Sequence, residues 1–168
     1  MARKSDVSPI VSGNAEAAQT ESFARGIALH ELPGYLIRRL DSRAASLYET
    51  FTGQSDLTPR QFGLLLTLFQ AGALPQTELG KRLHLDRSTL GEMLPRMVER
   101  NLLERRAHER DRRAVEITLT QSGKRALMAA VRQALEAQEA LLSPLPVYLR
   151  PVFLKCLQIL ADAEDPVD

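Results

Sequence analysis

The sequence predicts a mainly α-helical fold with a small β-wing. Three observations support this fold class. Apolar residues recur at helical spacing in most segments after residue 31, two short helical segments are separated by a tight break, and a strongly charged hairpin with strand-like alternation follows them. The chain has 168 residues, which favours a single domain large enough to bury a core.

Residues 1–26 are rich in Ser, Ala, Gly and small polar residues, so we predict a mobile N-terminal arm before a single domain over residues 27–168. No apolar run approaches the roughly 20 residues needed to span a bilayer. The N-terminus also has no apolar core of signal-peptide length. We therefore expect a cytoplasmic protein with no membrane partner. The single cysteine, Cys156, agrees, because it excludes a disulfide framework within the chain.

The first helix is predicted in "LPGYLIRRLDSRAASLYETF", within residues 27–53. One apolar stripe runs along it at spacings of three or four residues, formed by Leu32, Leu36, Leu40, Ala44, Leu47 and Phe51. Pro33 suits the first turn of this helix, and Gly53 suits its end.

A compact lobe is predicted over residues 57–119, beginning with "LTPRQFGLLLTLFQAG". Thr58 is a good N-cap with Pro59 at the first helical position, and Gly72 can end the helix. This helix is apolar nearly all round and should therefore lie centrally, because of Leu64, Leu65, Leu66, Leu68 and Phe69. Two short helices follow, "PQTELGKRLHL" and "DRSTLGEMLPRMVERN", with a tight break near His84 and Leu85.

The second short helix has one apolar and one polar face. Asp86 is a good N-cap for it, and Asn101 can take the left-handed conformation that ends a helix. Its inward stripe consists of Leu90, Leu94, Met97 and Val98. Its polar face consists of Arg87, Ser88, Thr89, Glu92 and Arg96.

Strand character replaces helical periodicity after Asn101. "LLERR" and "AVEITLT" predict two strands, the second alternating at Val115, Ile117 and Leu119, with the charged "AHERDRR" as the hairpin tip. Helical periodicity then returns in "QSGKRALMAAVRQALEAQEALL". A last helix, "VYLRPVFLKCLQILADAE", closes the chain, so residues 120–168 supply the C-terminal flanking helices.

This order of helix, helix, tight turn, helix and charged hairpin is that of a winged helix-turn-helix, which fits binding to double-stranded DNA. A helix can enter the major groove so that its N-terminal residues reach base edges. The polar face described above has the side chains that contact phosphates and base edges. The hairpin tip carries Arg110, Arg112 and Arg113, which can reach an adjacent minor groove. Residues 81–113 hold ten basic and six acidic residues, although the whole chain has a net charge of only +1.

The stretch "DRSTLGEMLPRMVERNLLERRAHERDRRAVEITLTQSGKRAL" resembles the MarR family of transcriptional regulators. It contains the Asp-x-Arg signature of the wing as Asp111 and Arg113, and "LTQSGK" at the start of the following helix. The resemblance covers roughly Leu32 to the C-terminus. It implies a homodimeric repressor whose first and last helices form the dimer interface. It also implies that Asp111 orients the wing and that Arg113 reaches the minor groove.

The resemblance also implies release from DNA by a small anionic, often aromatic, ligand or its coenzyme A thioester. The segment "LPGYLIRRL" is most similar to members that control aromatic-acid catabolism. Arg39 and Arg43 lie four residues apart, a spacing at which like charges repel on a helix, and neither has an acidic residue three or four positions away. Two interpretations remain: an anion pairs with them, or they form a solvated basic face. In a ligand site, an aromatic ring would lie against Tyr35, Leu36 and Phe62.

Other functional classes have less support in the sequence. No nucleophile–base pair, phosphate-binding glycine loop or paired-carboxylate motif predicts an enzyme, and no cofactor is expected. His30, His84 and His108 are too dispersed for a local metal motif. Cys156 is expected to be a small buried apolar residue. The alternative to DNA binding is a winged helix that only contacts other proteins, but such a contact needs no arginine-tipped hairpin.

Pro95 is the one residue that opposes its predicted helix. An interior proline removes an amide donor and clashes with the carbonyl four residues back, at a cost of about 3 kcal/mol or more. That carbonyl belongs to Gly91, whose backbone can relax. Two interpretations remain: a mild bend that aims Ser88–Glu92 separately from the rest of the helix, or a defect tolerated because tertiary packing holds the helix.

Overall fold

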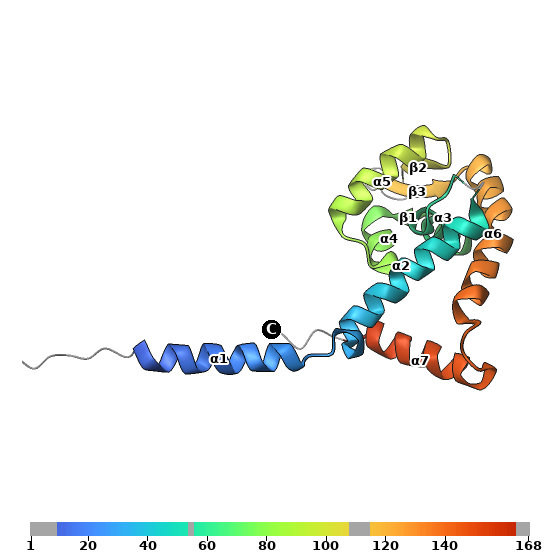
Figure 1. Cartoon of the computed structure of the whole chain (residues 1–168). Coiled ribbons are helices and arrows are strands. Elements are labelled where there is room, and N and C mark those ends of the chain that lie inside the picture. Colours follow the sequence, from blue (N-terminus) through green and yellow to red (C-terminus); the bar gives the residue numbers. More distant parts are fainter. Residues whose placement is uncertain (1–9, 54–55, 108–114, 164–168) are drawn as a thin grey trace, which may run out of the picture. The chain divides into compact units, whose positions relative to one another are not determined.

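The computed structural model describes residues 10–53, 56–107 and 115–163 (Figure 1). The chain divides into two compact units, residues 1–41 and residues 42–168. The first unit contains α1 (Ile10–Gly26), the 3-10 turn η1 (Leu29–Glu31) and the beginning of α2 (Pro33–Thr52). The rest of α2 and all later elements belong to the second unit.

Helix α1 lies where the composition predicted only a mobile arm. Its sequence, "IVSGNAEAAQTESFARG", contains several good helix formers, notably alanines, but no apolar stripe that would have signalled a helix. Phe23, one of its largest side chains, is 77% exposed. A helix is therefore present in part of the arm, whereas the mobility of the arm stays a prediction.

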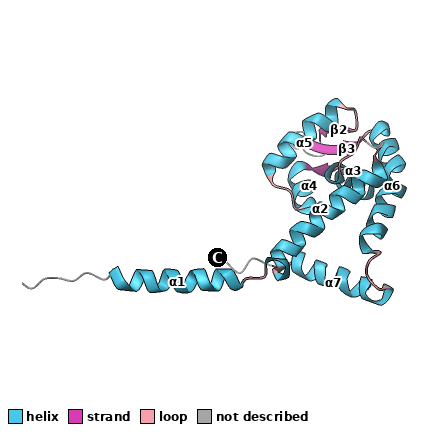
Figure 2. Ribbon diagram, viewed as in Figure 1, coloured by secondary structure: helices cyan, strands magenta, loops and turns pink. Residues whose placement is uncertain are grey.

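The predicted winged lobe is confirmed in the second unit. It contains α3 (Pro59–Ala71), α4 (Gln76–Leu83) and α5 (Arg87–Glu99), followed by β2 (Leu103–Ala107), β3 (Val115–Leu119) and α6 (Gln121–Leu142). Among the described residues, the strands form one antiparallel sheet in the order β1-β3-β2, drawn in magenta in Figure 2. The extra strand, β1 (Leu74–Pro75), pairs Leu74 with Ile117 and was not predicted, because two residues are too short to show alternation.

The predicted helix ends are also confirmed. Thr58 and Gln61 form a reciprocal capping box at the start of α3, with Thr58 Oγ1 accepting from the Gln61 amide at 3.3 Å. Gly72 follows α3 with a φ of 82°, a conformation that favours glycine. His84 and Asn101 take left-handed conformations with φ of 48° and 54°, so the chain turns sharply before and after α5.

The core of the lobe is a leucine-rich cluster around α3, which packs against α4, α6 and β3. Its largest fully buried side chains are Leu64, Leu65, Leu68, Leu79, Leu94, Met97, Leu103, Ile117 and Leu127. The central position predicted for α3 is therefore confirmed. Phe69 is an exception, since it remains 43% exposed, with the Lys124 ammonium 5.5 Å from the centre of its ring.

The C-terminal helix α7 (Arg150–Ala161) contributes nothing to this core. It begins later than predicted, because Val147–Leu149 form a 3-10 turn, η2, and none of the residues of α7, all of which are described, is buried. Figure 1 shows α7 leaving the end of α6 away from the winged lobe. The prediction that Cys156 is buried is therefore wrong for the single chain, because α7 packs chiefly against η2.

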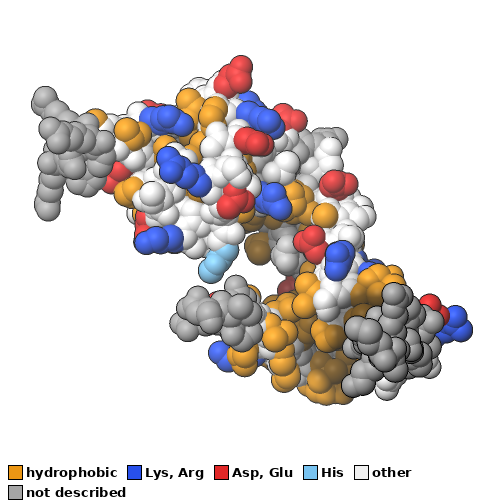
Figure 3. Space-filling model, turned by 90° about the vertical axis from the view of Figure 1, so that its left-hand side faces the viewer, with side chains coloured by type: hydrophobic (Ala, Val, Ile, Leu, Met, Phe, Trp, Pro, Cys, Tyr) orange, Lys and Arg blue, Asp and Glu red, His pale blue; other side chains and the backbone are white. Residues whose placement is uncertain are grey.

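Exposed apolar side chains from η2 and α7 form what we call the α7 surface: Val147, Tyr148, Val152, Leu154, Leu157, Ile159 and Leu160. Hydrophobic side chains also gather in the lower part of the view in Figure 3. Within the described residues no single helix is long and apolar enough to cross a membrane, and only α6 together with Val147–Ala161, a pair bent by 105°, has the length and composition.

The start of α6 approaches the backbone of the chain just before β2. Thr120 Oγ1 donates to the Asn101 carbonyl at 2.6 Å, and the Thr120 amide donates to the Leu102 carbonyl at 3.2 Å. A Cβ atom at Gly123 would lie 2.0 Å from the Leu102 carbonyl oxygen. Only glycine fits this contact without a backbone shift.

We therefore expect Gly123→Ala to lower the free energy of unfolding by about 1–3 kcal/mol or more, which is the usual effect of overpacking. Gly91→Ala is the matched control, because a Cβ there meets nothing within 4 Å, and alanine should stabilise the helix by about 1 kcal/mol. The free energy of unfolding from denaturant titration measures both effects. Equal stability of the two variants would contradict the close approach of α6 to Leu102.

Candidate nucleic-acid interface

The α4–turn–α5 unit positions α5 (Arg87–Glu99), which we call the reader helix. The left-handed residue His84 ends α4, and the Leu85 amide donates to the Gly80 carbonyl at 3.0 Å, which closes the turn. A Cβ atom at Gly80 would lie 2.9 Å from Leu90 Cδ1, so the glycine allows the two helices to approach closely. The direction of α5 is thus set by this contact and by the core.

The polar face of α5 is solvent-facing as predicted. Leu90, Leu94 and Met97 are buried, which leaves Arg87, Ser88, Glu92 and Arg96 exposed and Thr89 half-buried. The structure therefore brings all five predicted residues together on one helix. The helix continues through Pro95 without a break, and both interpretations of this proline remain.

A compact hydrogen-bond network caps the N-terminus of α5. Asp86 Oδ1 accepts from the Thr89 amide at 2.9 Å, and Asp86 Oδ2 accepts from Thr89 Oγ1 at 2.6 Å. The Ser88 hydroxyl also donates to Asp86 Oδ1. These hydrogen bonds hold the pKa of Asp86 well below its usual range. The Ser88 hydroxyl has the largest effect, followed by the Thr89 hydroxyl and amide. The sequence predicted the cap but not that both hydroxyls turn back onto it.

A hollow beside this cap adds polar residues of α4, Gln76, Thr77 and Lys81, that were not predicted as site residues from the sequence. It has a volume of about 1000 Å³ and is lined by Gln76, Thr77, Gly80, Lys81, His84, Leu85, Asp86, Arg87 and Leu90. Thr77, Lys81 and His84 are exposed and add candidate DNA contacts from α4 and the turn. The sequence signal for Lys81 is its position at the start of the basic segment 81–113. Arg82 is engaged locally, with its Nε 2.8 Å from Glu78 Oε1.

The wing is described up to Ala107 and again from Val115. Arg110, Asp111, Arg112, Arg113 and His108 lie outside the described residues, so the roles assigned to the wing tip stay predictions. The described strands pair Ala107 with Val115, which brings the two ends of the tip together. Figure 3 shows Lys and Arg side chains interspersed with acidic ones on the face of the molecule it presents.

The predicted ligand residues belong to different parts of the chain. Tyr35, Leu36 and Arg39 lie in the first unit, where the Arg39 guanidinium is 5.9 Å from the centre of the Tyr35 ring. Arg43 and Phe62 lie in the second unit, where the Phe62 ring is tilted against Tyr48 at 6.2 Å between centroids. Both arginines are exposed, and neither forms an ion pair with a described residue.

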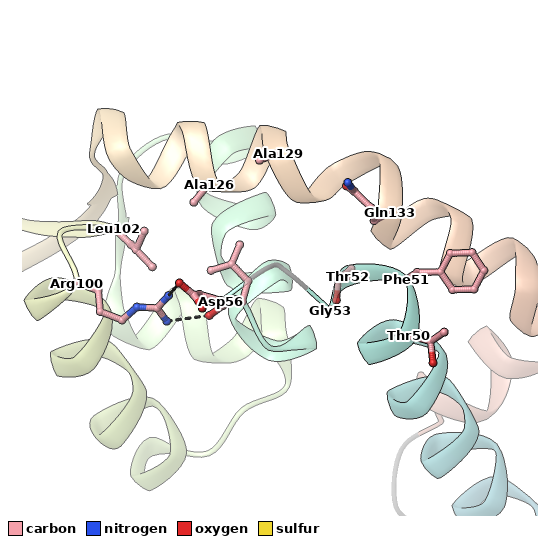
Figure 4. A pocket seen from close by; sticks show the side chains of 11 residues that line it. Thr50, Phe51, Thr52, Gly53, Asp56, Arg100, Leu102, Ala126, Ala129 and Gln133 are labelled. Carbon is pink, nitrogen blue, oxygen red and sulfur yellow. Dashed lines mark hydrogen bonds and ion pairs between the residues drawn. The ribbon is translucent and has the colours of Figure 1, made fainter.

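A cavity of about 880 Å³ lies between the end of α2, the residues before α3, the end of α5 and one side of α6 (Figure 4). Arg100 spans part of it and donates to the Asp56 carbonyl at 2.9 Å. The volume of this cavity is within the range of small-molecule sites. None of the five predicted ligand residues lines it. No group of three or more potential metal ligands is found among the described side chains.

Comparison with known proteins decides the family. The sequence profile of the MarR family matches residues 57–115, from the start of the lobe into the wing. A solved structure of the transcriptional repressor CouR bound to a 23-mer DNA duplex is 30% identical, covers 79% of this chain and 94% of its own, and has a TM-score of 0.73. The chain belongs to the MarR family.

Other MarR-family relatives support this assignment. The repressor NicR of Pseudomonas putida is 28% identical over 80% of this chain and 85% of its own length. The structure of BpsR of Bordetella bronchiseptica is 27% identical, covers 82% and 99% of the two chains, and has a TM-score of 0.78. The organic hydroperoxide resistance regulator of Bacillus subtilis is 36% identical, but the match spans 45% of this chain and about half, 52%, of that protein.

We expect Arg96→Ala to weaken binding to a specific operator more than binding to scrambled DNA. A good bidentate contact between an arginine and a base discriminates by about 1–3 kcal/mol. Arg132→Ala is the control, because Arg132 is exposed on α6 and paired with Glu136. Titrations of both duplexes by fluorescence anisotropy measure the ratio. An equal loss on both duplexes would show that Arg96 contacts only the DNA backbone.

Proposed function

We propose that this chain is a DNA-binding transcriptional regulator, acting as a homodimeric repressor on a pseudo-palindromic operator. The observation that carries the proposal is the arrangement of α5, whose apolar face is buried in the lobe while its N-terminal half presents a polar, arginine-containing face to solvent. Such a helix can enter a major groove. The relatives CouR, bound to a DNA duplex, and NicR, a repressor, support the proposal. A protein with this role acts in the cytoplasm.

The alternative is a winged helix that contacts only other proteins. Binding to DNA through phosphates releases counterions, so affinity falls steeply as salt rises. Protein contacts through an apolar surface respond much less to salt.

We therefore expect the full-length chain to shift a mixture of random duplexes at low salt and to lose this affinity as salt is raised. An electrophoretic shift assay at several salt concentrations measures this, with Arg87→Ala/Arg96→Ala as the weakened variant and Arg132→Ala as the matched control. No shift at any salt concentration would favour the protein-contact alternative.

The α7 surface supports the homodimer. Val147 is 75% exposed and Leu160 is 65% exposed in the single chain, although each such side chain gains about 1.5–3 kcal/mol when fully buried. A second copy of the chain would cover this surface. Two-fold symmetry would then place two reader helices on half-sites about 10 bp apart, or a multiple of one DNA turn.

We expect removal of residues 146–168 to give aggregated protein. The deletion removes the α7 surface. Other exposed apolar side chains, such as Met128 and Leu135 of α6, would then lack the cover that the proposed dimer gives them. Light scattering after gel filtration should give twice the chain mass of 18.7 kDa for the intact protein. A soluble, folded monomer from the shortened chain would contradict the dimer.

The effector is the second part of the proposal. DNA binding by BpsR is regulated by 6-hydroxynicotinic acid. The PcaV transcriptional regulator of Streptomyces coelicolor, which is 28% identical to this chain, was solved in complex with its natural ligand. We propose a small anionic aromatic compound or its coenzyme A thioester, held by Arg39 and Arg43, with its ring against Tyr35, Leu36 and Phe62. Charge-assisted hydrogen bonds from arginine to a carboxylate are strong and often bidentate. The ligand releases DNA if it binds the arrangement that cannot bind DNA more tightly than the one that can.

Arg39→Ala and Arg43→Ala should still bind operator but should need more ligand for release. A panel of aromatic carboxylates and their thioesters, titrated against a preformed protein–DNA complex, measures this, and calorimetry on free protein gives the binding constants. Arg125→Ala is a suitable control, because it removes an exposed arginine on α6. Release of both variants at the wild-type ligand concentration would leave the two arginines as a solvated basic face.

A further inference from the structure

The cap of α5 has a consequence for which bases the reader helix can recognise. We propose that Asp86 sets the hydrogen-bond polarity of Ser88 and Thr89, so that both hydroxyls read DNA only as acceptors and select the amino groups of adenine and cytosine. The inference rests on the proposed function, since it assumes that α5 enters the major groove. It assigns to Asp86 the role of a positioning residue that need not touch DNA itself.

The geometry determines where the two hydroxyl protons lie. An ionised carboxylate has only acceptor atoms, so in each oxygen–oxygen contact with Asp86 the hydroxyl must be the donor. Thr89 Oγ1 is 2.6 Å from Asp86 Oδ2, and Ser88 Oγ bonds to Oδ1. Each hydroxyl has one proton, and both protons are used within the cap. What remains on each oxygen is its lone pairs, which can accept a hydrogen bond.

Acceptors on the protein exclude most partners in the major groove. Guanine N7 and O6, adenine N7 and thymine O4 are acceptors, whereas adenine N6 and cytosine N4 are donors. Phosphate oxygens are acceptors as well, so neither hydroxyl can bond the DNA backbone without leaving Asp86. Every base pair carries one such amino group, on adenine or on cytosine. The contact therefore specifies which strand carries the amino-bearing base at that position.

The rest of the polar face agrees with this division of roles. Glu92 is exposed one turn after Ser88 and adds a third acceptor to the same side of α5. Arg87 and Arg96 are donors on either side of these acceptors. The reader helix thus presents an acceptor centre at Ser88, Thr89 and Glu92 that suits amino groups, flanked by cations that suit guanine or phosphate.

Asp86→Asn changes the polarity but keeps the cap. Asparagine caps helices as well as aspartate does. Its amide oxygen must stay on the Thr89 amide, because the other atom, Nδ2, is a donor and cannot accept that bond. Thr89 Oγ1 then faces a donor, so its own proton becomes free to bond an acceptor on a base. The variant should therefore tolerate guanine or thymine where the wild type requires adenine or cytosine.

The experiment begins with a duplex enriched by the wild-type protein from a random library. Each adenine of a half-site is replaced in turn by purine, and each cytosine by pyrimidin-2-one, which deletes the amino group. We expect about a 5-fold loss of wild-type affinity at the contacted position, the usual size of one net hydrogen bond. Thr89→Val and Ser88→Ala should lose nothing further at that position, because the partner hydroxyl is already absent.

Two controls separate this reading from a general loss of structure. Thr50→Val removes an exposed hydroxyl on α2 that donates to the Ser46 carbonyl, and it should show the full wild-type penalty. Asp86→Asn should stay folded, with a melting temperature lowered only slightly by loss of the charged cap, while the penalty at the Thr89 position becomes smaller. Affinities are compared as ratios between duplexes, because loss of the carboxylate charge raises affinity for all DNA.

The outcomes distinguish this inference from the proposed function. Absence of binding to any duplex would overturn both. DNA binding in which deletion of amino groups costs wild type and Ser88→Ala or Thr89→Val equally would overturn the acceptor role alone. An Asp86→Asn protein with the wild-type base preference would show that Asp86 serves only as a helix cap.

Discussion

The burial of Leu90, Leu94 and Met97 in the core of the lobe is the constraint on which the candidate interface depends. These side chains are 2%, 0% and 0% exposed, and they lie on one side of α5. A helix whose apolar stripe is buried cannot rotate about its axis without exposing that stripe to water. Every side chain on the opposite side therefore points to solvent in a fixed direction. The polar face of α5 is a consequence of the core.

The turns at either end of α5 complete this constraint. Asp86 caps the first turn, and Asn101 in a left-handed conformation ends the helix and starts the approach to β2. Thr120 then attaches α6 to the same short segment by donating hydrogen bonds to the carbonyls of Asn101 and Leu102, and Gly123 leaves room for this close approach. The reader helix, the wing and the long helix α6 are thus joined within a few residues. A shift of α6 must be felt at the C-terminal end of α5, which gives a physical route for coupling between these elements.

The distribution of apolar surface separates the lobe from the flanking helices. The lobe buries its leucines within one chain, whereas α7 buries none of its residues there. The lobe therefore has its own buried core, whereas the aliphatic side chains of the α7 surface remain exposed to water, which is unfavourable. This contrast explains why Cys156, expected among buried neighbours, is exposed in the single chain.

The sequence by itself determined the features that act within one helical turn. The caps at Thr58 and Asp86, the tight break near His84, the left-handed position at Asn101 and the buried stripe of α5 are local, because each depends on residues at most a few positions apart. Only the tertiary structure decided the pairing of Leu74 with Ile117, the contact of Gly123 with Leu102, and the exposure of α7. The first two are contacts between segments far apart in the chain. The third depends on which elements pack against α7. Local periodicity in the sequence predicts none of the three. The directions of the Ser88 and Thr89 hydroxyls were also unpredictable, because three side chains compete for the same hydrogen bonds and only their positions in space settle which ones form.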